Sequence, residues 1–237
     1  MGLGDILSKS FSYPLSDLTK YLLVGIGIFI CDLDACLGEI LGPSHFIVII
    51  AFIIAVLFSF VMAGYSVNVT KRGIDNSNEI PSYDFKNNLI DGLKLFVVFL
   101  VYFIIPTIIT LALLIVFGLI GAGFRQILRS LGIWAFLAAI IFIIFGIFGV
   151  IAHARYALSR SITDAISIGD VVEDVKRIGI LKIILFVIVE SILLIVYALI
   201  MGVVTVVPTI GTLIADVILG GFIMLFVNYG VGLLYAE

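Results

Sequence analysis

The sequence predicts an all-α protein, a polytopic transmembrane helix bundle of about six spans with in-plane amphipathic helices on the cytoplasmic side. Composition, the length of the apolar stretches and the distribution of basic residues lead to this prediction. Of the 237 residues, 63% are hydrophobic and 12% are charged, against about 45–50% and about 25% in soluble domains. The mean hydropathy is +1.34. Because a small soluble domain buries only about two-thirds to three-quarters of its surface, lipid is the solvent that fits.

Several apolar stretches are long enough to cross the ~30 Å hydrocarbon core, which needs roughly 20 apolar residues. The stretch Leu18–Leu37 is the weakest of them, because Asp32 and Asp34 follow its short apolar core. It either spans fully, with both acids at the headgroup level, or enters the membrane as a re-entrant half-helix. The other predicted spans are Phe46–Val67, Leu93–Gly121, Leu131–Ala152, Ile180–Val206 and Ile210–Tyr235.

The basic residues predict the orientation, because short cytoplasmic loops of membrane proteins are enriched in Lys and Arg. Six spans would place only Arg125 and Arg129 on one side. The remaining basic residues, eleven of the 13 in the chain, would face the cytoplasm. We therefore predict a cell-membrane protein with both termini in the cytoplasm. The eleven residues are Lys9, Lys20, Lys71, Arg72, Lys86, Lys94, Arg155, Arg160, Lys176, Arg177 and Lys182.

The chain reads as a single integral membrane domain over residues 1–237, with a possible repeat of three hairpins. The repeat units would be residues 1–67, 80–152 and 158–235. Each hairpin is preceded by a cytoplasmic segment in which apolar residues recur at helical spacing. Such segments can lie in the interface with their apolar face toward the acyl chains. The alternative is that these are ordinary amphipathic flanks of membrane helices.

Two acids within predicted spans are candidate functional residues, since ionisable groups in membranes are rare. Glu190 lies about ten residues into its span, whereas Asp216 lies about seven residues from the outer end of the last span. At 1.5 Å per residue their depths differ by roughly 14 Å, so we do not expect a carboxylate pair. The alternative for each acid is a hydrogen-bonded packing role.

The outer segment between the first two spans holds residue types that bind metals, including Cys31, Cys36 and His45. The spacing of the two cysteines matches no common zinc site, and positions five apart do not share a helix face. An oxidising exterior would permit a disulfide between Cys31 and Cys36. A solvated loop, a disulfide and a metal site all stay open, and we predict no bound metal.

The stretch that follows the fourth span holds two candidate contacts to lipid phosphates, Arg155 and Arg160. Arginine binds phosphate through two parallel hydrogen bonds. With His153 and Tyr156, these residues would open the third in-plane segment. The alternative is that they only anchor the cytoplasmic side.

Several function classes are disfavoured. No basic stripe interleaved with aromatic residues indicates nucleic acid. No Ser-His-Asp set, His-rich zinc motif or glycine-rich phosphate loop is present. The two histidines, His45 and His153, are predicted on opposite sides of the membrane. We therefore expect neither catalysis nor a cofactor.

Several stretches resemble an uncharacterised prokaryotic membrane-protein family, the domain of unknown function numbered 4013. The most specific block runs from Ile80-Pro81-Ser82-Tyr83-Asp84-Phe85 into Leu89-Ile90-Asp91-Gly92-Leu93-Lys94-Leu95-Phe96. The other stretches are Ser12-Tyr13-Pro14, Gly64-Tyr65 with Asn68, and Ala154-Arg155-Tyr156-Ala157. The segment Cys31–Pro43 departs from the family in being longer and more acidic. The resemblance implies a helical membrane domain and carries no activity.

We therefore expect a non-enzymatic multi-pass membrane protein, acting as a structural, accessory or lipid-interacting helix bundle. Its expected partners are membrane lipids, and a homo-oligomer is left open. The alternative function is a small-solute or ion permease or channel that uses the intramembrane carboxylate of Glu190. A membrane enzyme that acts on lipid is a third, weaker hypothesis.

Overall fold

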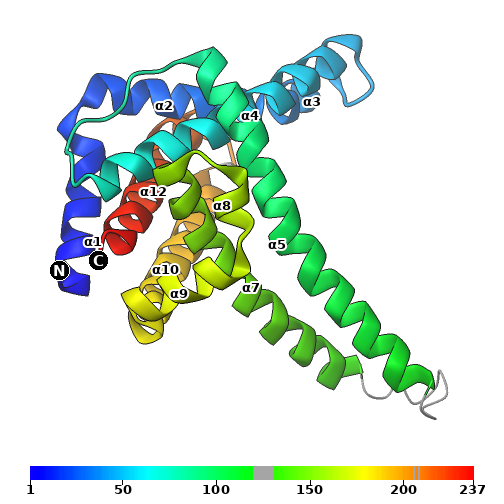
Figure 1. Ribbon diagram of the computed structural model, residues 1–237. Coiled ribbons are helices and arrows are strands. Elements are labelled where there is room, and N and C mark those ends of the chain that lie inside the picture. Colours follow the sequence, from blue (N-terminus) through cyan, green and yellow to red (C-terminus); the bar gives the residue numbers. More distant parts are fainter. Residues whose placement is uncertain (120–130, 205, 208) are drawn as a thin grey trace.

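The computed structural model describes residues 1–119, 131–204, 206–207 and 209–237, and in these residues the regular elements are helical (Figure 1). They are α1 (Leu3–Ser12), the 3-10 helix η1 (Tyr13–Ser16), α2 (Leu18–Cys31), α3 (Leu33–Leu41), α4 (Phe46–Ile74), α5 (Phe85–Leu119), α7 (Leu131–Ser159), α8 (Ile162–Ile166), α9 (Ile168–Ile178), α10 (Ile180–Val204), α11 (Ile210–Ile214), the π-helix η2 (Ala215–Gly220) and α12 (Gly221–Tyr235). The predicted all-α class is confirmed.

Five described helical segments are long and apolar enough to cross a membrane: α4, α5, α7, α10 and the continuous run Ile210–Tyr235. Three of them extend past the apolar stretch that predicted them. Helix α4 continues beyond Val67 to Ile74, α5 begins at Phe85, and α7 continues to Ser159. These extensions carry the basic and polar residues, so hydropathy alone could not mark the helix ends. Arg125 and Arg129 lie outside the described residues.

The predicted helix Leu18–Leu37 is wrong as one continuous element. Helix α2 ends at Cys31, its C-cap is Asp32, and α3 begins at Leu33. The 14 residues of α2 extend about 21 Å, less than the hydrocarbon core. Both α2 and α3 pack against α4. A sixth span is present only if Leu3–Ser16 and Leu18–Cys31, which meet at a bend of 92°, are counted as one broken span.

The three predicted in-plane segments behave differently. The first is a separate element, α1, which the 92° bend sets apart from α2. The third contains the short helices α8 and α9. The second is wrong, because residues 85–96 form the first turns of α5 without a break. Nothing in those residues stops a helix, and tight packing on α4 holds them in line with the span. Similarly, residues 153–156 lie within α7 rather than opening the third segment.

Helix α4 is the centre of the bundle and packs against α2, α3, α5, α7 and α12. Backbones touch where α4 meets α12, since a Cβ atom added to Gly232 would lie 2.1 Å from the carbonyl oxygen of Thr70. Small residues permit such close approach between membrane helices. Helix α10 makes far fewer contacts and lies at the edge of the bundle. The three-hairpin repeat over residues 1–67, 80–152 and 158–235 stays a prediction.

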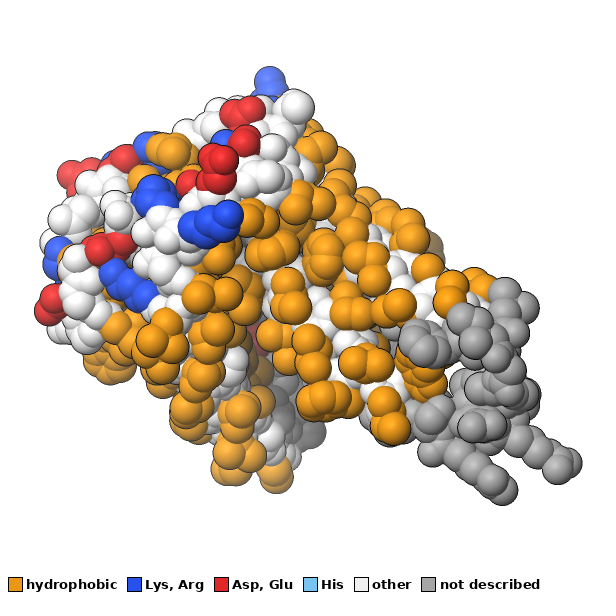
Figure 2. All heavy atoms as spheres, turned by 60° about the horizontal axis from the view of Figure 1, so that its bottom comes forward, with side chains coloured by type: hydrophobic (Ala, Val, Ile, Leu, Met, Phe, Trp, Pro, Cys, Tyr) orange, Lys and Arg blue, Asp and Glu red, His pale blue; other side chains and the backbone are white. Residues whose placement is uncertain are grey.

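The surface is divided between a charged end and apolar projecting helices (Figure 2). Large apolar side chains are widely exposed on α5, α7 and α10, for example Phe103 at 60%, Phe136 at 67% and Leu199 at 67%. Exposure on this scale exceeds what soluble monomers show, and it is compatible with a membrane protein.

Both chain termini lie at the same end of the molecule (Figure 1). The Met1 ammonium forms an ion pair with the Glu237 carboxylate, and Lys182 Nζ lies 2.9 Å from the same side chain. Hydrogen bonds from the N-terminus and Lys182 hold the pKa of Glu237 below its usual range.

Candidate functional site

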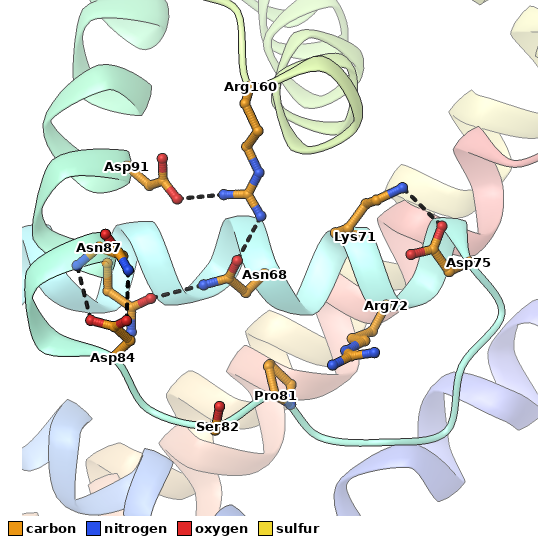
Figure 3. A pocket seen from close by; sticks show the side chains of 11 residues that line it. Asn68, Lys71, Arg72, Asp75, Pro81, Ser82, Asp84, Asn87, Asp91 and Arg160 are labelled. Carbon is orange, nitrogen blue, oxygen red and sulfur yellow. Dashed lines mark hydrogen bonds and ion pairs between the residues drawn. The ribbon is translucent and has the colours of Figure 1, made fainter.

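A polar pocket of about 530 Å³ lies where the C-terminal end of α4 meets the start of α5 (Figure 3). Helix α4, the loop that follows it, α5 and the end of α7 supply its walls. The pocket is the candidate site because charged and amide side chains converge there at the end of apolar helices. Its lining residues are Asn68, Lys71, Arg72, Asp75, Pro81, Ser82, Asp84, Asn87, Asn88, Asp91 and Arg160.

Helix α4 ends in a left-handed residue, Asn76, whose φ is 49°. The amide of Ser77 donates to the carbonyl of Arg72 at 2.9 Å, and the amide of Asn76 donates to Gly73 at 3.0 Å. This is the Schellman pattern, which satisfies the last helix carbonyls. Lys71 and Asp75 close a salt bridge of 2.9 Å one turn apart along the same helix end.

The loop from Asn76 to Asp84 is held by donors from surrounding helices. Tyr13 OH donates to the Glu79 carbonyl at 3.1 Å, and Lys20 Nζ donates to the Ile80 carbonyl at 2.7 Å. Tyr65 OH donates to the Pro81 carbonyl at 2.9 Å. Burial also raises the pKa of the loop residue Tyr83 to about 12. The pocket wall is therefore fixed by the helices rather than left free.

The two helices that frame the pocket touch backbone to backbone. A Cβ atom at Gly64 would lie 1.7 Å from the carbonyl oxygen of Asn88, and one at Gly92 would lie 1.8 Å from that of Phe60. Only glycine fits at this pair of positions. The close contact aligns the α4 face that carries Asn68 with the α5 face that carries Asn88, and Asn68 Nδ2 donates to Asn88 Oδ1 at 2.8 Å.

Arg160 joins three helices at one point. It follows the end of α7 with a φ of 57°, which costs a non-glycine residue about 1–2 kcal/mol. Its Nη1 lies 2.5 Å from Asp91 Oδ2, and its Nη2 donates to Asn68 Oδ1 at 2.6 Å. Tyr156 OH donates to the other Asp91 oxygen at 3.1 Å. These contacts offset the backbone cost and hold α7 against α4 and α5.

Every charged side chain that lines the pocket forms a hydrogen bond or an ion pair, except that of Arg72. Asp84 caps α5, accepting from the Asn87 amide at 3.1 Å and from its Nδ2 at 2.6 Å. Among the described residues, Arg72 forms neither a hydrogen bond through its side chain nor an ion pair, and Figure 3 shows its guanidinium turned toward the loop that carries Pro81. The fully buried Asn88 also keeps an unpartnered Nδ2. Two donors are thus left open.

A family model described as a protein of unknown function, DUF4013, matches residues 47–206 of the chain. The chain belongs to the DUF4013 family. No curated protein and no solved structure matches it. The match begins after the unusually acidic segment 31–43, and it includes every residue that lines the pocket. The stretch that most specifically carries the resemblance, residues 80–96, forms the pocket loop and the first turns of α5.

Another part of the family-matched chain contains a second ion-pair cluster, centred on Arg155. Its Nη1 lies 2.7 Å from Asp174 Oδ2, and its Nη2 lies 2.8 Å from Asp170 Oδ2. Tyr235 OH donates to the same Asp174 oxygen at 2.8 Å. The cluster fastens α9 and the C-terminal helix to α7. Phosphate contacts by Arg155 and Arg160 stay a prediction, but both guanidinium groups already hold acids of this chain.

The two acids that were predicted to lie within spans are buried, and neither lines the pocket. Glu190 in α10 is 7% exposed and Asp216 in η2 is 1% exposed. One Glu190 oxygen and both Asp216 oxygens have no hydrogen-bond partner among the described residues. Among the described residues no hydrogen bond joins the two acids, and the difference in their depths stays a prediction.

The cysteines and histidines do not form a site in the described residues. Cys31 and Cys36 are free thiols, and Cys31 Sγ lies 3.2 Å from the Gly27 carbonyl on its own helix. His45 caps α4, its Nδ1 accepting from the Ile47 amide at 3.3 Å. His153 is buried, and its Nε2 lies 3.4 Å from Ser66 Oγ. The described residues offer no group of three metal-ligand side chains.

Sequence reasoning missed most of the pocket. Arg72 counted only toward the orientation, and Asp91 and Asn68 only toward the family resemblance. One signal was available: four polar residues, Asp84, Asn87, Asn88 and Asp91, recur at spacings of three and four and share one face of the α5 start. The apolar residues of the same segment predict an interfacial helix instead, and the polar face does not enter that prediction.

Proposed function

We propose that the protein is a non-enzymatic multi-pass membrane protein whose polar pocket binds a phosphate-bearing lipid headgroup. The observation that carries this proposal is Arg72, which lines the pocket without an opposing acid. The other two cations there are matched, Lys71 by Asp75 and Arg160 by Asp91. The third acid, Asp84, accepts hydrogen bonds only from Asn87, so the lining is neutral as a whole. An anion that enters the pocket would bind at Arg72, whose guanidinium no acid meets.

The chemistry of the lining supports binding of phosphate. Arginine presents a planar fork of donors that suits phosphate oxygens. The amide of Asn88 adds an unpartnered donor, and an unpartnered buried donor costs about 1–3 kcal/mol unless a partner reaches it. Histidine and cysteine are absent from this lining, and its three acids are engaged. These features favour a binding role over catalysis.

The position of the pocket supports a lipid as the source of the phosphate. The loop segment 80–84 separates the polar pocket from an apolar groove of about 220 Å³ between α2 and α4. Ser82 and Asp84 line the pocket, whereas Tyr83 lines the groove with apolar residues such as Leu23 and Phe58. Polar and apolar parts of one lipid would find matching surfaces on the two sides of this loop.

The proposed location is the cell membrane, with the charged end and both termini in the cytoplasm. Eleven of the 13 basic residues in the chain support this orientation. The anionic lipids of a cytoplasmic leaflet attract such a surface by about 1 kcal/mol for each basic residue near it.

The test is native mass spectrometry of the purified protein titrated with dihexanoyl phosphatidylglycerol. We expect Arg72→Gln to weaken binding about tenfold or more, since a charge-assisted hydrogen bond contributes about 1.5–3 kcal/mol. Lys176→Gln is the matched control, because Lys176 is an exposed cation of α9 outside the pocket. It removes the same charge and should leave affinity nearly unchanged.

Two further ligands separate the explanations. Dihexanoyl glycerol lacks the phosphate and should not bind, whereas inorganic phosphate should compete weakly if the pocket recognises phosphate itself. Equal loss of affinity in Arg72→Gln and Lys176→Gln would reduce the effect to general surface charge and would refute the pocket.

A permease or channel remains the second candidate, and one observation favours it. Glu190 lies buried in α10 with an unpartnered oxygen. A transporter is expected to offer a cavity near the middle of the membrane that reaches its ionisable group. Glu190 lines neither the polar pocket nor the apolar groove beside it.

A further inference from the structure

Asp216 lies in an unusual part of the last spanning segment. Residues Ala215–Gly220 form a π-helix, η2, between the α-helical parts α11 and α12. π-Helical turns are rare and occur often at functional sites. Here the turn packs tightly on α2, because a Cβ atom at Gly25 would lie 2.0 Å from the carbonyl oxygen of Val217. Tyr21 of α2 donates its hydroxyl to the Ile218 carbonyl within the turn.

The carboxylate of Asp216 is enclosed without a partner. Its residue is 1% exposed, and neither oxygen has a hydrogen-bond partner among the described residues. An isolated buried carboxylate is costly to keep charged in an apolar surrounding. Something must therefore neutralise it in the folded protein, and the described residues provide no cation for this purpose.

Other polar groups face Asp216 from several helices. Asp32, exposed at the end of α2, and the hydroxyl of Tyr197 in α10 interact electrostatically with it. The thiols of Cys31 and Cys36 do so as well. The Tyr197 hydroxyl lies 3.6 Å from the position of a Cβ atom on Gly220, one turn after Asp216. The side chain of Thr212 in α11 reaches Cys36.

We propose that Asp216 is the centre of a binding site for a monovalent cation, a proton or sodium, which Asp32 and the hydroxyls around it help to hold. The shared chemistry is one positive charge that neutralises the enclosed carboxylate. The described residues contain no group of three metal-ligand side chains, and two carboxylates with hydroxyls suit a hard monovalent ion rather than zinc. Because Asp32 is exposed, the cation enters past Asp32 at the end of α2.

The acids around the site support cation entry. Burial, aided by repulsion from Asp34, raises the pKa of Asp32. Burial likewise raises the pKa of the Cys36 thiol, and the Asp216 charge adds to this effect. Additional negative charge is thus unfavourable in this region, and a cation bound at Asp216 would reduce the repulsion between the acids. Glu190 differs, because no titratable group among the described residues interacts with it.

The test measures the thermal unfolding midpoint, Tm, of the purified protein. One arm compares sodium chloride with choline chloride at equal ionic strength and constant pH. The other arm varies pH without sodium. A cation that binds only the folded state raises Tm, by about 3–6 °C at a tenfold excess over its Kd. Sodium binding gives a rise in the first arm. Proton binding gives a Tm that falls as pH rises.

Asp216→Asn should abolish the sodium dependence and reduce the fall of Tm with rising pH, since the amide needs no neutralising charge. Glu190→Gln is the matched control in the sodium arm, a second buried acid whose replacement should leave the sodium dependence intact. In the pH arm both proteins carry Glu190→Gln, because burial of Glu190 also disfavours its charged form. A wild-type Tm that responds to neither sodium nor pH would overturn the proposal. An undiminished sodium or pH response in Asp216→Asn would overturn it as well.

Should Asp216→Asn fail to fold, the wild-type protein still decides the matter. Dicyclohexylcarbodiimide adds to protonated carboxyl groups in apolar surroundings, and peptide mass spectrometry identifies the modified residue. Modification of Asp216 should slow when sodium is added or when pH rises. A rate unaffected by both would refute the cation site.

Discussion

The charged end and the apolar region treat their polar groups in opposite ways. At the charged end, Asp91 meets both Arg160 and Tyr156, and Asp174 meets both Arg155 and Tyr235. In the apolar region, Glu190 and Asp216 keep oxygens that no described residue reaches. The same chain thus closes one set of acids within networks and leaves another set open.

The difference separates structural acids from acids available for binding. A partly buried ion pair strongly resists removal of one partner, because the other charge is then left uncompensated. The networks at the charged end therefore hold helices in position, and Arg72 stands out by not participating. An unpartnered acid in an apolar region instead points to a function by default.

The largest expected effect tests whether the charged end and helix α3 face opposite sides of a membrane. We expect single cysteines at Glu79 and Thr163, both exposed at the charged end, to be protected from an impermeant thiol reagent in intact cells. A cysteine at Glu39, exposed in α3, should react fully. The background is Cys31→Ser with Cys36→Ser.

Permeabilised cells provide the control for this labelling, since all three positions should then react. Reaction at Glu79 or Thr163 in intact cells would reverse the orientation. Protection at all three positions would place α3 on the cytoplasmic side and would contradict a sixth span.

The next largest effect is a loss of stability at the charged end, where α4 and α5 are in close contact. Gly64→Ala places a Cβ atom 1.7 Å from the Asn88 carbonyl oxygen, so α4 and α5 must separate. Overpacking typically costs about 1–3 kcal/mol and occasionally more. We expect a lower Tm and weaker binding at the pocket. Gly146→Ala is the control, because nothing lies within 4 Å of its added Cβ.

If Gly64→Ala and Gly146→Ala unfolded at the same temperature, the α4–α5 contact would be looser than the structure indicates. Loss of pocket binding without loss of Tm would sharpen the comparison instead. It would show that the contact positions Asn68 and Asn88 more than it stabilises the bundle.

Hydropathy predicted five membrane-length helices because apolar length is a local property of the chain. It failed at Leu18–Leu37, where local acids end α2 at Asp32 and only packing on α4 decides how α3 continues. The pocket was less predictable. Arg160 meets Asp91 and Asn68 across separations of 69 and 92 residues, and no local pattern encodes such pairing.

The buried acids show the same limit. Counting residues along each span predicts that Glu190 lies apart from Asp216, and neither Asp216 oxygen has a hydrogen-bond partner among the described residues. The approach of Asp32 to Asp216 depends on the tight contact of α2 with a π-helical turn. A glycine at position 25 and an acid at position 216 do not predict that contact on their own.

The smallest effect is expected at Glu190, where the comparison can be made sharper within the apolar region itself. Burial there disfavours the charged carboxylate, and no titratable group lies close enough to compensate it. If the acid only packs, Glu190→Gln keeps the shape and a donor, so stability should change little. Polar contacts between membrane helices average only about 0.6 kcal/mol. Glu190→Leu should then be tolerated within about 1–2 kcal/mol, and it stabilises if the unpartnered oxygen is a net cost.

Liposomes that contain a pH-sensitive dye test the permease alternative under an imposed gradient. A proton flux in the wild type that disappears in Glu190→Gln, at unchanged Tm, would make Glu190 a transport residue. Equal flux in both proteins would assign it to packing, because a residue that carries the proton cannot be replaced by an amide without loss of transport.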